Sequence, residues 1–388
     1  MPDVCLSTKI WRSGTGWFAQ ALAGALAEAG LRTAFVAPAA EPASREPVHP
    51  NLRRFVLSRE IVVPAPRPAR IRASLRRMAG GIAALARLRP TTRTFLFSIP
   101  EPLIVTLPVF AALRLTGARI VFIVHDPEPH AWRYRGVARR IERAGHALSY
   151  RLANHLVVLT PSAAQGLGRA FGVAAEKVSV IPHGPFTLDG VAPLPGQGRF
   201  LVFGTLRRNK GVLAAIGGVT LARRQGHDVR LVLAGEPHPD EPDYWRECEA
   251  AIRQDPEGFE VHRRFVPDEE LPGILAGIDA FVLAYDGFQS QSGVGVLAAV
   301  NRRPVIGTRS GGLAELFDRG MAGETIEDPP SPEGVAAAIG RFRAVSAETW
   351  RLRAAEAAIR VTGGLSWPEI GRAYRALIER LENDRRPA

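Results

Sequence analysis

The sequence predicts an α/β fold built from two Rossmann-like domains, each a doubly wound parallel sheet with helices on both faces. Two observations carry this prediction. Short apolar runs typical of buried strands alternate with longer helical patterns almost from end to end of the chain. The alternation breaks once, at the Pro- and Gly-rich stretch PFTLDGVAPLPGQG (185–198), and then restarts. A chain of 388 residues is long enough for two such domains.

The N-terminal half supplies the first set of elements. DVCLST predicts a strand, which a Gly-containing turn joins to the helix WFAQALAGALAEAG. Further strands are predicted at RTAFVAP, RIVFIVHD, HLVVLT and VSVIPHG. We assign residues 1–186 to a first domain.

The C-terminal half repeats the pattern. Strands are predicted at RFLVFGTL, VRLVLAG, FEVHRRFV, AFVLAY and RPVIGT, with helices such as GVLAAIGGVTLARRQG and EELPGILAGI between them. We assign 187–198 to a linker that acts as a hinge, 199–370 to a second domain, and 371–388 to a C-terminal helix and tail. The closing sequence SWPEIGRAYRALIERLEN is strongly amphipathic, so this helix is expected to pack back on the fold.

Charge is unevenly distributed. The formal net charge is +12, but residues 1–185 hold 25 Lys+Arg against 10 Asp+Glu, and the remainder is slightly acidic. The densest basic stretch, 67–93, alternates arginine with Ala, Ile and Leu. Such a segment either lies on an anionic membrane surface or forms a solvated helix. Nucleic acid is not expected as a partner because the stretch lacks aromatic residues for stacking. The candidate acceptor or membrane residues here are Arg67, Arg70, Arg72, Arg76 and Arg77.

The composition indicates a cytoplasmic protein. Cys5 and Cys248 match no metal or redox spacing, which favours a reducing compartment. The N-terminus lacks the layout of a signal peptide. The most apolar stretch, FLFSIPEPLIVTLPVFAALRL, contains three prolines and Glu101, so it is not expected to span a bilayer. The protein is therefore expected to be soluble, with peripheral association at the inner face of the membrane left open.

Ligands of such sheets bind beyond the carboxyl ends of the strands, so the loops there hold the candidate site. Gly14, Gly16 and Ala19 satisfy the weak pattern G-x-G-x-x-A, but the acidic residue expected about 20 positions later in a dinucleotide site is absent. The glycines fit either a close approach to a phosphate or sugar or a turn without a ligand. His125 ends an apolar strand and is either structural or a donor to a sugar hydroxyl.

In the second domain, Arg207, Arg208 and Lys210 end a strand before a glycine and a helix, as suits a diphosphate. Ser292 is a candidate N-cap for the helix VGVLAAVN. Gln291 and its uncharged neighbours can donate hydrogen bonds to phosphate or sugar oxygens without repelling them. A second binding loop for phosphate or sugar is predicted at TRSGGLAEL, where a glycine turn enters a helix that holds Glu315.

Six motifs in order resemble a known family. FGTLRRNKGV, VSVIPHG, RLVLAGE, AFVLAY, QSGVGVLAAVNRRPVIGTRSGGLAEL and SWPEIGRAYRAL resemble retaining GT-B glycosyltransferases of the bacterial group 1 family, most strongly over 200–370. The resemblance implies transfer of a sugar from a nucleotide diphosphate, in a cleft between two Rossmann-like domains. It implies that Arg207 and Lys210 hold the diphosphate, that Gly16 approaches it, and that His125 contacts the sugar. The remaining implied donor contacts are the amides of Ser292, Gly293 and Val294, and the backbone near Arg264 and Val266.

One departure from the family bears on donor choice. Many members carry two Glu eight residues apart, where this chain has Gln289 and Leu297. Glu315 is a candidate substitute.

The expected reaction is metal-independent, because the chain has no Asp-x-Asp and the leaving diphosphate can take the acceptor proton. No cofactor is expected. The expected partners are a UDP- or GDP-sugar donor, a glycan or lipid-linked acceptor of the cell envelope, and an anionic membrane surface. Three alternatives stay open: a sugar-nucleotide epimerase of the same fold, a dinucleotide oxidoreductase resting on GTGWFA, and a non-catalytic sugar-nucleotide-binding protein.

Overall fold

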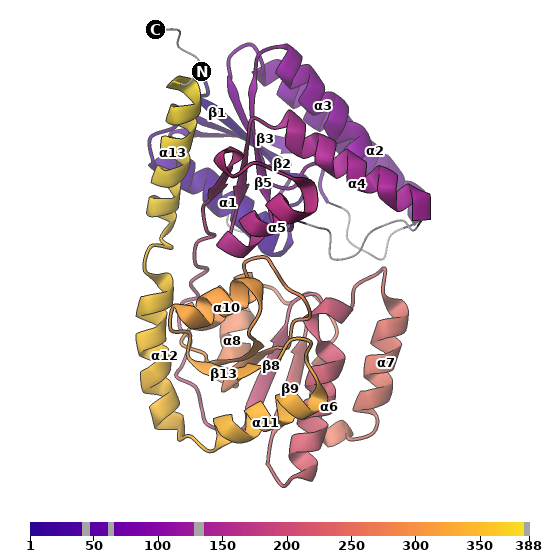
Figure 1. Cartoon of the computed structure of the whole chain (residues 1–388), viewed down its shortest axis with the longest axis vertical. Helices are drawn as coiled ribbons and strands as arrows, with labels where there is room; N and C mark the ends of the chain where they lie inside the picture. The colour runs from indigo at the N-terminus through magenta and orange to yellow at the C-terminus, as the bar shows by residue number, and fades with distance from the viewer. Residues whose placement is uncertain (41–46, 61–65, 128–135, 384–388) are drawn as a thin grey trace. The chain divides into compact units, whose positions relative to one another are not determined.

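A computed structural model of the chain describes residues 1–40, 47–60, 66–127 and 136–383 and divides the chain into two compact units (Figure 1). The N-terminal unit comprises Met1–Gly184 together with Ser366–Ala388, and the C-terminal unit comprises Pro185–Leu365. Each unit contains one fully parallel sheet with helices on both faces, as the alternating pattern predicted.

The sheet of the N-terminal unit has seven strands in the order β3-β2-β1-β4-β5-β6-β7. The central strands are continuous apolar runs because helices cover both of their faces. β1 is paired with β2 and β4, so Val4 lies between Thr33 and Thr94. The strands are β1 (Val4–Ser7), β2 (Thr33–Pro38), β3 (Leu52–Leu57), β4 (Thr94–Phe97), β5 (Arg119–Val124), β6 (His155–Val158) and β7 (Val178–Val180).

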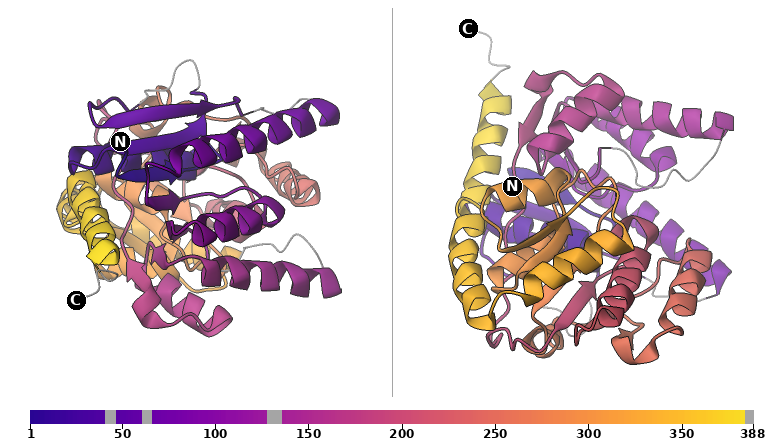
Figure 2. Two further views of the ribbon diagram at one scale, coloured as in Figure 1. Left: turned by 90° about the horizontal axis from the view of Figure 1, so that it is seen from above. Right: turned by 60° about the horizontal axis from the view of Figure 1, so that its bottom comes forward.

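Two helical layers cover this sheet. One buried cluster joins it to α2, α3, α4 and α5, and another joins its opposite face to α1 and α13. Figure 2 shows the same separation of α2, α3 and α4 from the C-terminal helix. At Gly371 of α13 an added Cβ would lie 2.2 Å from the carbonyl oxygen of Ala25, so these two helices pack backbone to backbone. The helices are α1 (Ser13–Glu28), α2 (Arg67–Leu88), α3 (Leu103–Leu115), α4 (Gly136–Leu152), α5 (Pro161–Phe171), the short η1 (Ala175–Lys177) and α13 (Trp367–Asn383).

The sheet of the C-terminal unit has six strands in the order β10-β9-β8-β11-β12-β13. This is the strand order of a Rossmann fold. The strands are β8 (Arg199–Phe203), β9 (Arg230–Ala234), β10 (Phe259–His262), β11 (Ala280–Leu283), β12 (Val305–Thr308) and β13 (Gly323–Ile326).

Helices cover both faces of this second sheet as well. α6, α7 and α11 share one buried cluster with it, and α8, α9 and α10 share the other. The helices are η2 (Arg208–Lys210), α6 (Val212–Arg224), α7 (Pro242–Ile252), η3 (Pro256–Gly258), α8 (Leu271–Ala276), α9 (Gly293–Val300), α10 (Gly311–Asp318), α11 (Pro332–Arg343) and α12 (Ala347–Thr362).

Two segments have specific places in these units. The Pro- and Gly-rich segment 187–198 belongs to the C-terminal unit: Leu194 is buried in its core, and the amides of Gly196 and Gly198 donate to Asp279. The apolar stretch 95–115 forms most of β4 followed by α3, which contains Pro108. Within the described residues, no helix is both long enough and apolar enough to cross a bilayer.

Candidate functional site

Three loops meet at the carboxyl edge of the sheet in the C-terminal unit. They follow β8, β11 and β12, which are neighbours in the sheet. The strand order reverses between β8 and β11, and such a switch point is where open α/β sheets bind ligands.

These loops are packed tightly against one another. The amide of Asp286 donates to the carbonyl oxygen of Asn209 at 3.0 Å. Gly211 has a φ of +60°, and an added Cβ there would lie 1.7 Å from the carbonyl oxygen of Ala284. Gly311 approaches the backbone of the same β11 loop just as closely. The loop after β11 is therefore held between the other two.

Several buried polar atoms at this edge have no hydrogen-bond partner in the described part of the chain. They are Nε of Arg207, both side-chain amide atoms of Asn209, and the hydroxyl oxygens of Thr308 and Ser310. A buried polar group left unsatisfied costs about 1–3 kcal/mol, so a ligand rich in oxygen atoms would stabilise this arrangement. Of the four residues, sequence reasoning identified only Arg207. The others lie in loops that it had selected, but their burial is visible only in the fold.

The cations of the β8 loop differ in their surroundings. The ammonium of Lys210 lies 3.8 Å from the centre of the Tyr285 ring, which holds it by a cation–π contact. Arg208 instead forms an ion pair with Glu247 and stacks over Tyr244. Arg207 and Lys210 thus remain the candidate diphosphate ligands.

The three helices that begin at this edge differ in their caps. Ser292 caps α9 by accepting from the amide of Gly295 at 3.0 Å, which confirms the predicted N-cap. The N-cap residue of α6 is Gly211, which has no side chain, and the Leu213 amide in the first turn donates to the Tyr244 hydroxyl at 2.9 Å. Ser310 occupies the N-cap position of α10, yet its hydroxyl makes no capping bond. The partial positive charge of the uncapped start of α10 favours an anion.

The other predicted donor residues are distributed over the same unit. Arg264 is exposed and pairs with Glu270. Leu297, at the position of a Glu in many group 1 members, is 3% exposed and packs in the core of this unit. The remaining predicted residues are Val266 (buried), Gln291, Gly293, Val294 and Glu315 (all half-buried), and Gln289 (exposed).

In the N-terminal unit, His125 ends β5 within an aromatic cluster. Its Nε2 shares a hydrogen bond of 2.9 Å with the hydroxyl of Ser98, and its ring packs edge-on against Phe18. His183 and Trp367 pack against the same Phe18. Removal from water lowers the pKa of His125 and that of His183 to about 4, so both rings are neutral at pH 7.

The predicted glycine turn lies inside a helix. α1 begins at Ser13, so Gly14 and Gly16 occupy its first turn. An added Cβ at Gly16 would lie 2.2 Å from the carbonyl oxygen of Trp11, whereas Gly14 faces open space. Glycine at position 16 is therefore required by the packing of the preceding loop itself.

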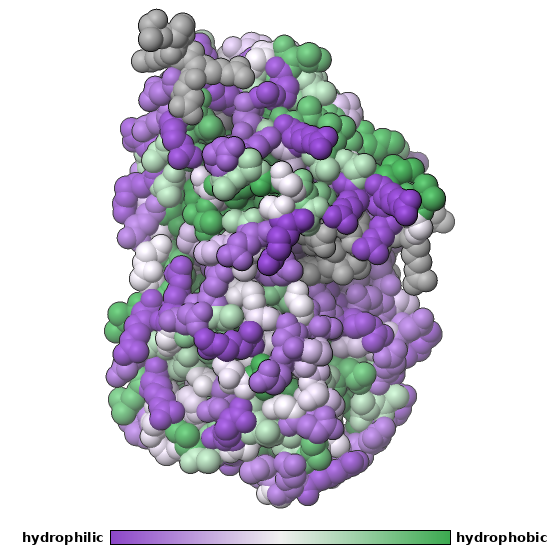
Figure 3. All heavy atoms as spheres, viewed as in Figure 1, coloured by the Kyte–Doolittle hydropathy of each residue, from purple (hydrophilic) through white to green (hydrophobic). Residues whose placement is uncertain are grey.

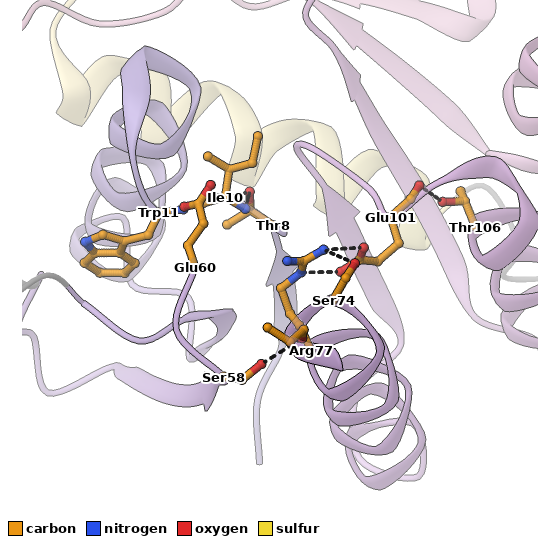
Figure 4. Close-up of polar contacts among 10 residues, drawn as sticks. Thr8, Ile10, Trp11, Ser58, Glu60, Ser74, Arg77, Glu101 and Thr106 are labelled. Carbon is orange, nitrogen blue, oxygen red and sulfur yellow. Dashed lines mark hydrogen bonds and ion pairs between the residues drawn. The ribbon is translucent and has the colours of Figure 1, made fainter. Parts of the chain in front are cut away.

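Charged residues surround that loop at the switch point between β1 and β4. The carboxylate of Glu60 accepts from the amides of Trp11 (3.0 Å) and Arg12 (3.3 Å) (Figure 4). Arg77 forms a bidentate pair with Glu101 at 2.9 and 3.1 Å. Beside this pair a cavity of about 40 Å³ lies between α2 and α3, with apolar walls and Lys9 at its lining. Burial lowers the pKa of Lys9, and its ammonium makes no hydrogen bond within the described residues.

The basic residues predicted for acceptor or membrane binding all lie on α2. Arg70, Arg72 and Arg76 are exposed, whereas Arg77 is held by Glu101. For Arg67, which opens the helix, the structure describes only the backbone.

Metal-binding groups do not gather in the described ranges. There, no three His, Cys, Asp or Glu side chains lie close enough to hold an ion. Both cysteines are fully buried, and burial raises the pKa of the Cys248 thiol to about 11 and that of Cys5 still further.

Comparisons with known proteins agree with this architecture. Residues 12–185 match the model of Glycosyltransferase Family 4, and residues 197–344 match the model of Glycosyl transferases group 1. A glycogen synthase of Mycobacterium tuberculosis is 28% identical over 283 residues, which are 69% of this chain but only 64% of that relative.

Solved structures share the fold over nearly the whole chain. Sucrose-phosphate synthase from Thermosynechococcus elongatus has a TM-score of 0.74 at 17% identity, covering 98% of this chain and 99% of its own. Anabaena HepE in complex with UDP and glucose has a TM-score of 0.71 at 16% identity, covering 98% and 100%.

Proposed function

We propose that this chain, which belongs to the group 1 glycosyltransferases of the GT-B fold, transfers a hexose-type sugar from a nucleotide-diphosphate donor to an acceptor with retention of configuration and without a required metal. The observation that carries the proposal is the group of unpartnered buried polar atoms on Arg207, Asn209, Thr308 and Ser310. They occupy one edge of one sheet, beside the starts of α6 and α10. A diphosphate supplies the negative charge and the oxygen atoms that such a place lacks.

The nature of the donor is supported by the similar proteins. HepE was solved with UDP and glucose, and the partial relative is a glycogen synthase. We therefore propose a UDP- or GDP-sugar, bound in the C-terminal unit.

The reaction needs mainly stabilisation of the departing charge. As the bond from the sugar to the diphosphate breaks, a pair of electrons and a negative charge pass to the phosphate oxygen. Arg207, Lys210 and the amides at the starts of α6 and α10 would stabilise that charge. The acceptor hydroxyl attacks the same face of the sugar and gives its proton to the departing phosphate. Neutral His125 can donate a hydrogen bond to a sugar hydroxyl.

The acceptor is proposed to bind the N-terminal unit and to be a glycan or lipid-linked molecule of the cell envelope. Support comes from the exposed Arg70, Arg72 and Arg76 on α2. An acceptor that carries a diphosphate group would suit these arginines.

The donor proposal is tested by thermal stabilisation with UDP, GDP, ADP and NAD. A ligand at 100 times its Kd adds about 2.7 kcal/mol to the free energy of unfolding. We expect one of UDP and GDP to stabilise the wild type, and the Arg207→Ala/Lys210→Ala protein to lose that stabilisation. Arg208→Ala is the matched control, because this neighbouring arginine pairs with Glu247 and should leave nucleotide binding unchanged.

The outcomes separate the alternatives. Stabilisation by NAD alone would contradict the proposed donor. Turnover of the sugar nucleotide without any acceptor would identify an epimerase. Binding that never leads to transfer, with lipid-linked and soluble glycan acceptors supplied, would identify a non-catalytic binding protein.

A further inference from the structure

Exposed apolar side chains concentrate on three helices of the N-terminal unit. Eight of the sixteen large hydrophobic residues that are exposed in the described ranges lie on α2, α3 and α4. Figure 3 shows hydrophobic atoms running along this side of the unit, interrupted by hydrophilic residues. The eight are Ile71, Leu75 and Ile82 on α2, Ile104 and Leu115 on α3, and Val137, Ile141 and Leu148 on α4.

The same spacing recurs on all three helices. Ile71, Leu75 and Ile82 follow one another at intervals of four and seven residues, and Val137, Ile141 and Leu148 repeat those intervals. On α3 the exposed Pro108 completes the same pattern between Ile104 and Leu115. Residues at these intervals lie on one side of a helix. Each helix therefore presents one apolar stripe to solvent.

The three helices form one layer. Leu85, Phe110 and Tyr150, one from each helix, belong to the same buried cluster on one face of the sheet. α3 and α4 touch, since the side chain of Leu103 lies against Gly145. α2 and α3 line the same cavity, and Arg77 of α2 pairs with Glu101 in the loop just before α3. The three helices are seen side by side in Figures 1 and 2.

The charge on this layer has one sign. Its three helices contain eleven arginines and one acidic residue, Glu142. Exposed arginines flank the stripes, among them Arg72 and Arg76 on α2 and Arg140 on α4. Arginines can keep their guanidinium groups in the lipid headgroup layer while neighbouring apolar side chains enter the acyl region. This combination complements an anionic lipid surface in both charge and hydrophobicity.

We propose that the exposed face of α2, α3 and α4 docks on an anionic lipid bilayer. The inference deepens the proposed function, because it places the N-terminal unit at the surface where a lipid-linked acceptor resides. Its occupant is the bilayer itself, and the three apolar stripes enter the headgroup boundary.

Flotation of the full chain with lipid vesicles, without donor or acceptor, tests the proposal. We expect binding to phosphatidylcholine vesicles containing phosphatidylglycerol and little binding to phosphatidylcholine alone, with binding weakened by salt. Val137→Ser/Ile141→Ser/Leu148→Ser should weaken binding by about tenfold or more, since several buried methylene groups are lost. Arg72→Gln/Arg76→Gln/Arg140→Gln should weaken it about fivefold for each arginine removed.

The matched control is Leu352→Ser/Ile359→Ser on α12, which removes two equally exposed apolar residues from the C-terminal unit. It should bind as the wild type does. Equal loss in this control, or no flotation of the wild type at low salt, would overturn the proposal. A competition experiment with poly-glutamate gives a further test. If poly-glutamate displaces the serine variant and the wild type from the vesicles equally, the surface recognises an acidic protein partner and the proposal is overturned.

Nucleotide stabilisation of the α4 serine variant distinguishes failure here from failure of the proposed function. The variant should be stabilised by the nucleotide as the wild type is. If the wild type is stabilised by the nucleotide but does not bind vesicles, only the proposed membrane surface is contradicted. If it binds vesicles but is not stabilised by the nucleotide, only the proposed donor site is contradicted.

Discussion

Replacement of Gly211 by alanine should destabilise the C-terminal unit far more than the same change at Gly287. The two glycines have nearly equal φ angles, +60° and +58°, in the left-handed region. Alanine costs about 1 kcal/mol in that conformation at either position. Only at Gly211 does the new Cβ meet backbone, 1.7 Å from the carbonyl oxygen of Ala284, whereas Gly287 has nothing within 4 Å.

The difference between the two variants measures the close packing of the loops. Relieving the overlap requires the β8 and β11 loops to separate by more than an ångström, and overpacking of this kind costs about 1–3 kcal/mol. We expect Gly211→Ala to lose about 2 kcal/mol more than Gly287→Ala.

Hydrogen exchange is a suitable assay because it reports the stability of one region. A difference of about 2 kcal/mol corresponds to roughly thirtyfold faster exchange of the α6 amides, at about 1.4 kcal/mol per tenfold. Gly211→Ala should also weaken nucleotide stabilisation, because Arg207 and Lys210 lie in the displaced loop. Equal exchange rates in the two variants would refute the close approach of the loops and, with it, the account of why glycine stands at 211.

Three further predictions concern histidine titration, a core position and a loop carboxylate. His125, His155 and His183 have pKa values near 4 in the folded chain, lowered first by burial, and near 6.5 when unfolded, so the unfolded state binds protons first as the pH falls. The stability that they contribute should be complete above pH 6.5 and be lost between pH 6.5 and 4, by up to about 3 kcal/mol each. Denaturant unfolding across this pH range measures the loss. His155→Gln should make the unfolding free energy depend less steeply on pH. Leu297→Glu should cost about 4 kcal/mol or more by burying an unpaired carboxylate, while Gln289→Glu at an exposed position should change stability by no more than about 0.5 kcal/mol. Urea unfolding measures both changes. Equal losses of unfolding free energy in the two variants would contradict the core position of Leu297. Glu60→Gln should cost about 1–2 kcal/mol by weakening the bonds to the amides of Trp11 and Arg12, which should appear as faster hydrogen exchange in the 8–12 loop. Unchanged exchange there would contradict the stabilising role of the carboxylate.

Most central strands of both sheets followed from the sequence because strands covered on both faces consist of uninterrupted apolar residues. The exception is β4, which lies between β1 and β5 and was not predicted. The edge strand β3 did not, since its LRRFVL includes half-exposed and exposed residues, with Arg53 among the latter. Likewise β13 (GETI) has only one buried residue. Both β3 and β13 lack the continuous apolar run that identifies a buried strand.

The candidate site was predictable to the level of loops. Arg207 and Lys210 stand out as cations after a strand, and Ser292 as a cap before an apolar helix. Asn209, Thr308 and Ser310 are unremarkable in a loop sequence, and they become candidates only because the fold buries their polar atoms without a partner. Gly16 illustrates the converse, since the sequence left open a ligand or a turn without one, and the structure explains the glycine by the carbonyl of Trp11.

The return of α13 to the N-terminal unit sets an order of events on the ribosome. Residues 185–365 form the other unit, so the first 184 residues emerge, and that whole unit follows, before the last helix is made. Until then the face of the first sheet that Ile370, Tyr374 and Leu377 will cover remains apolar and open to water. A nascent chain stalled before residue 366 should therefore expose a surface that chaperones recognise, although every residue of its second unit has been synthesised.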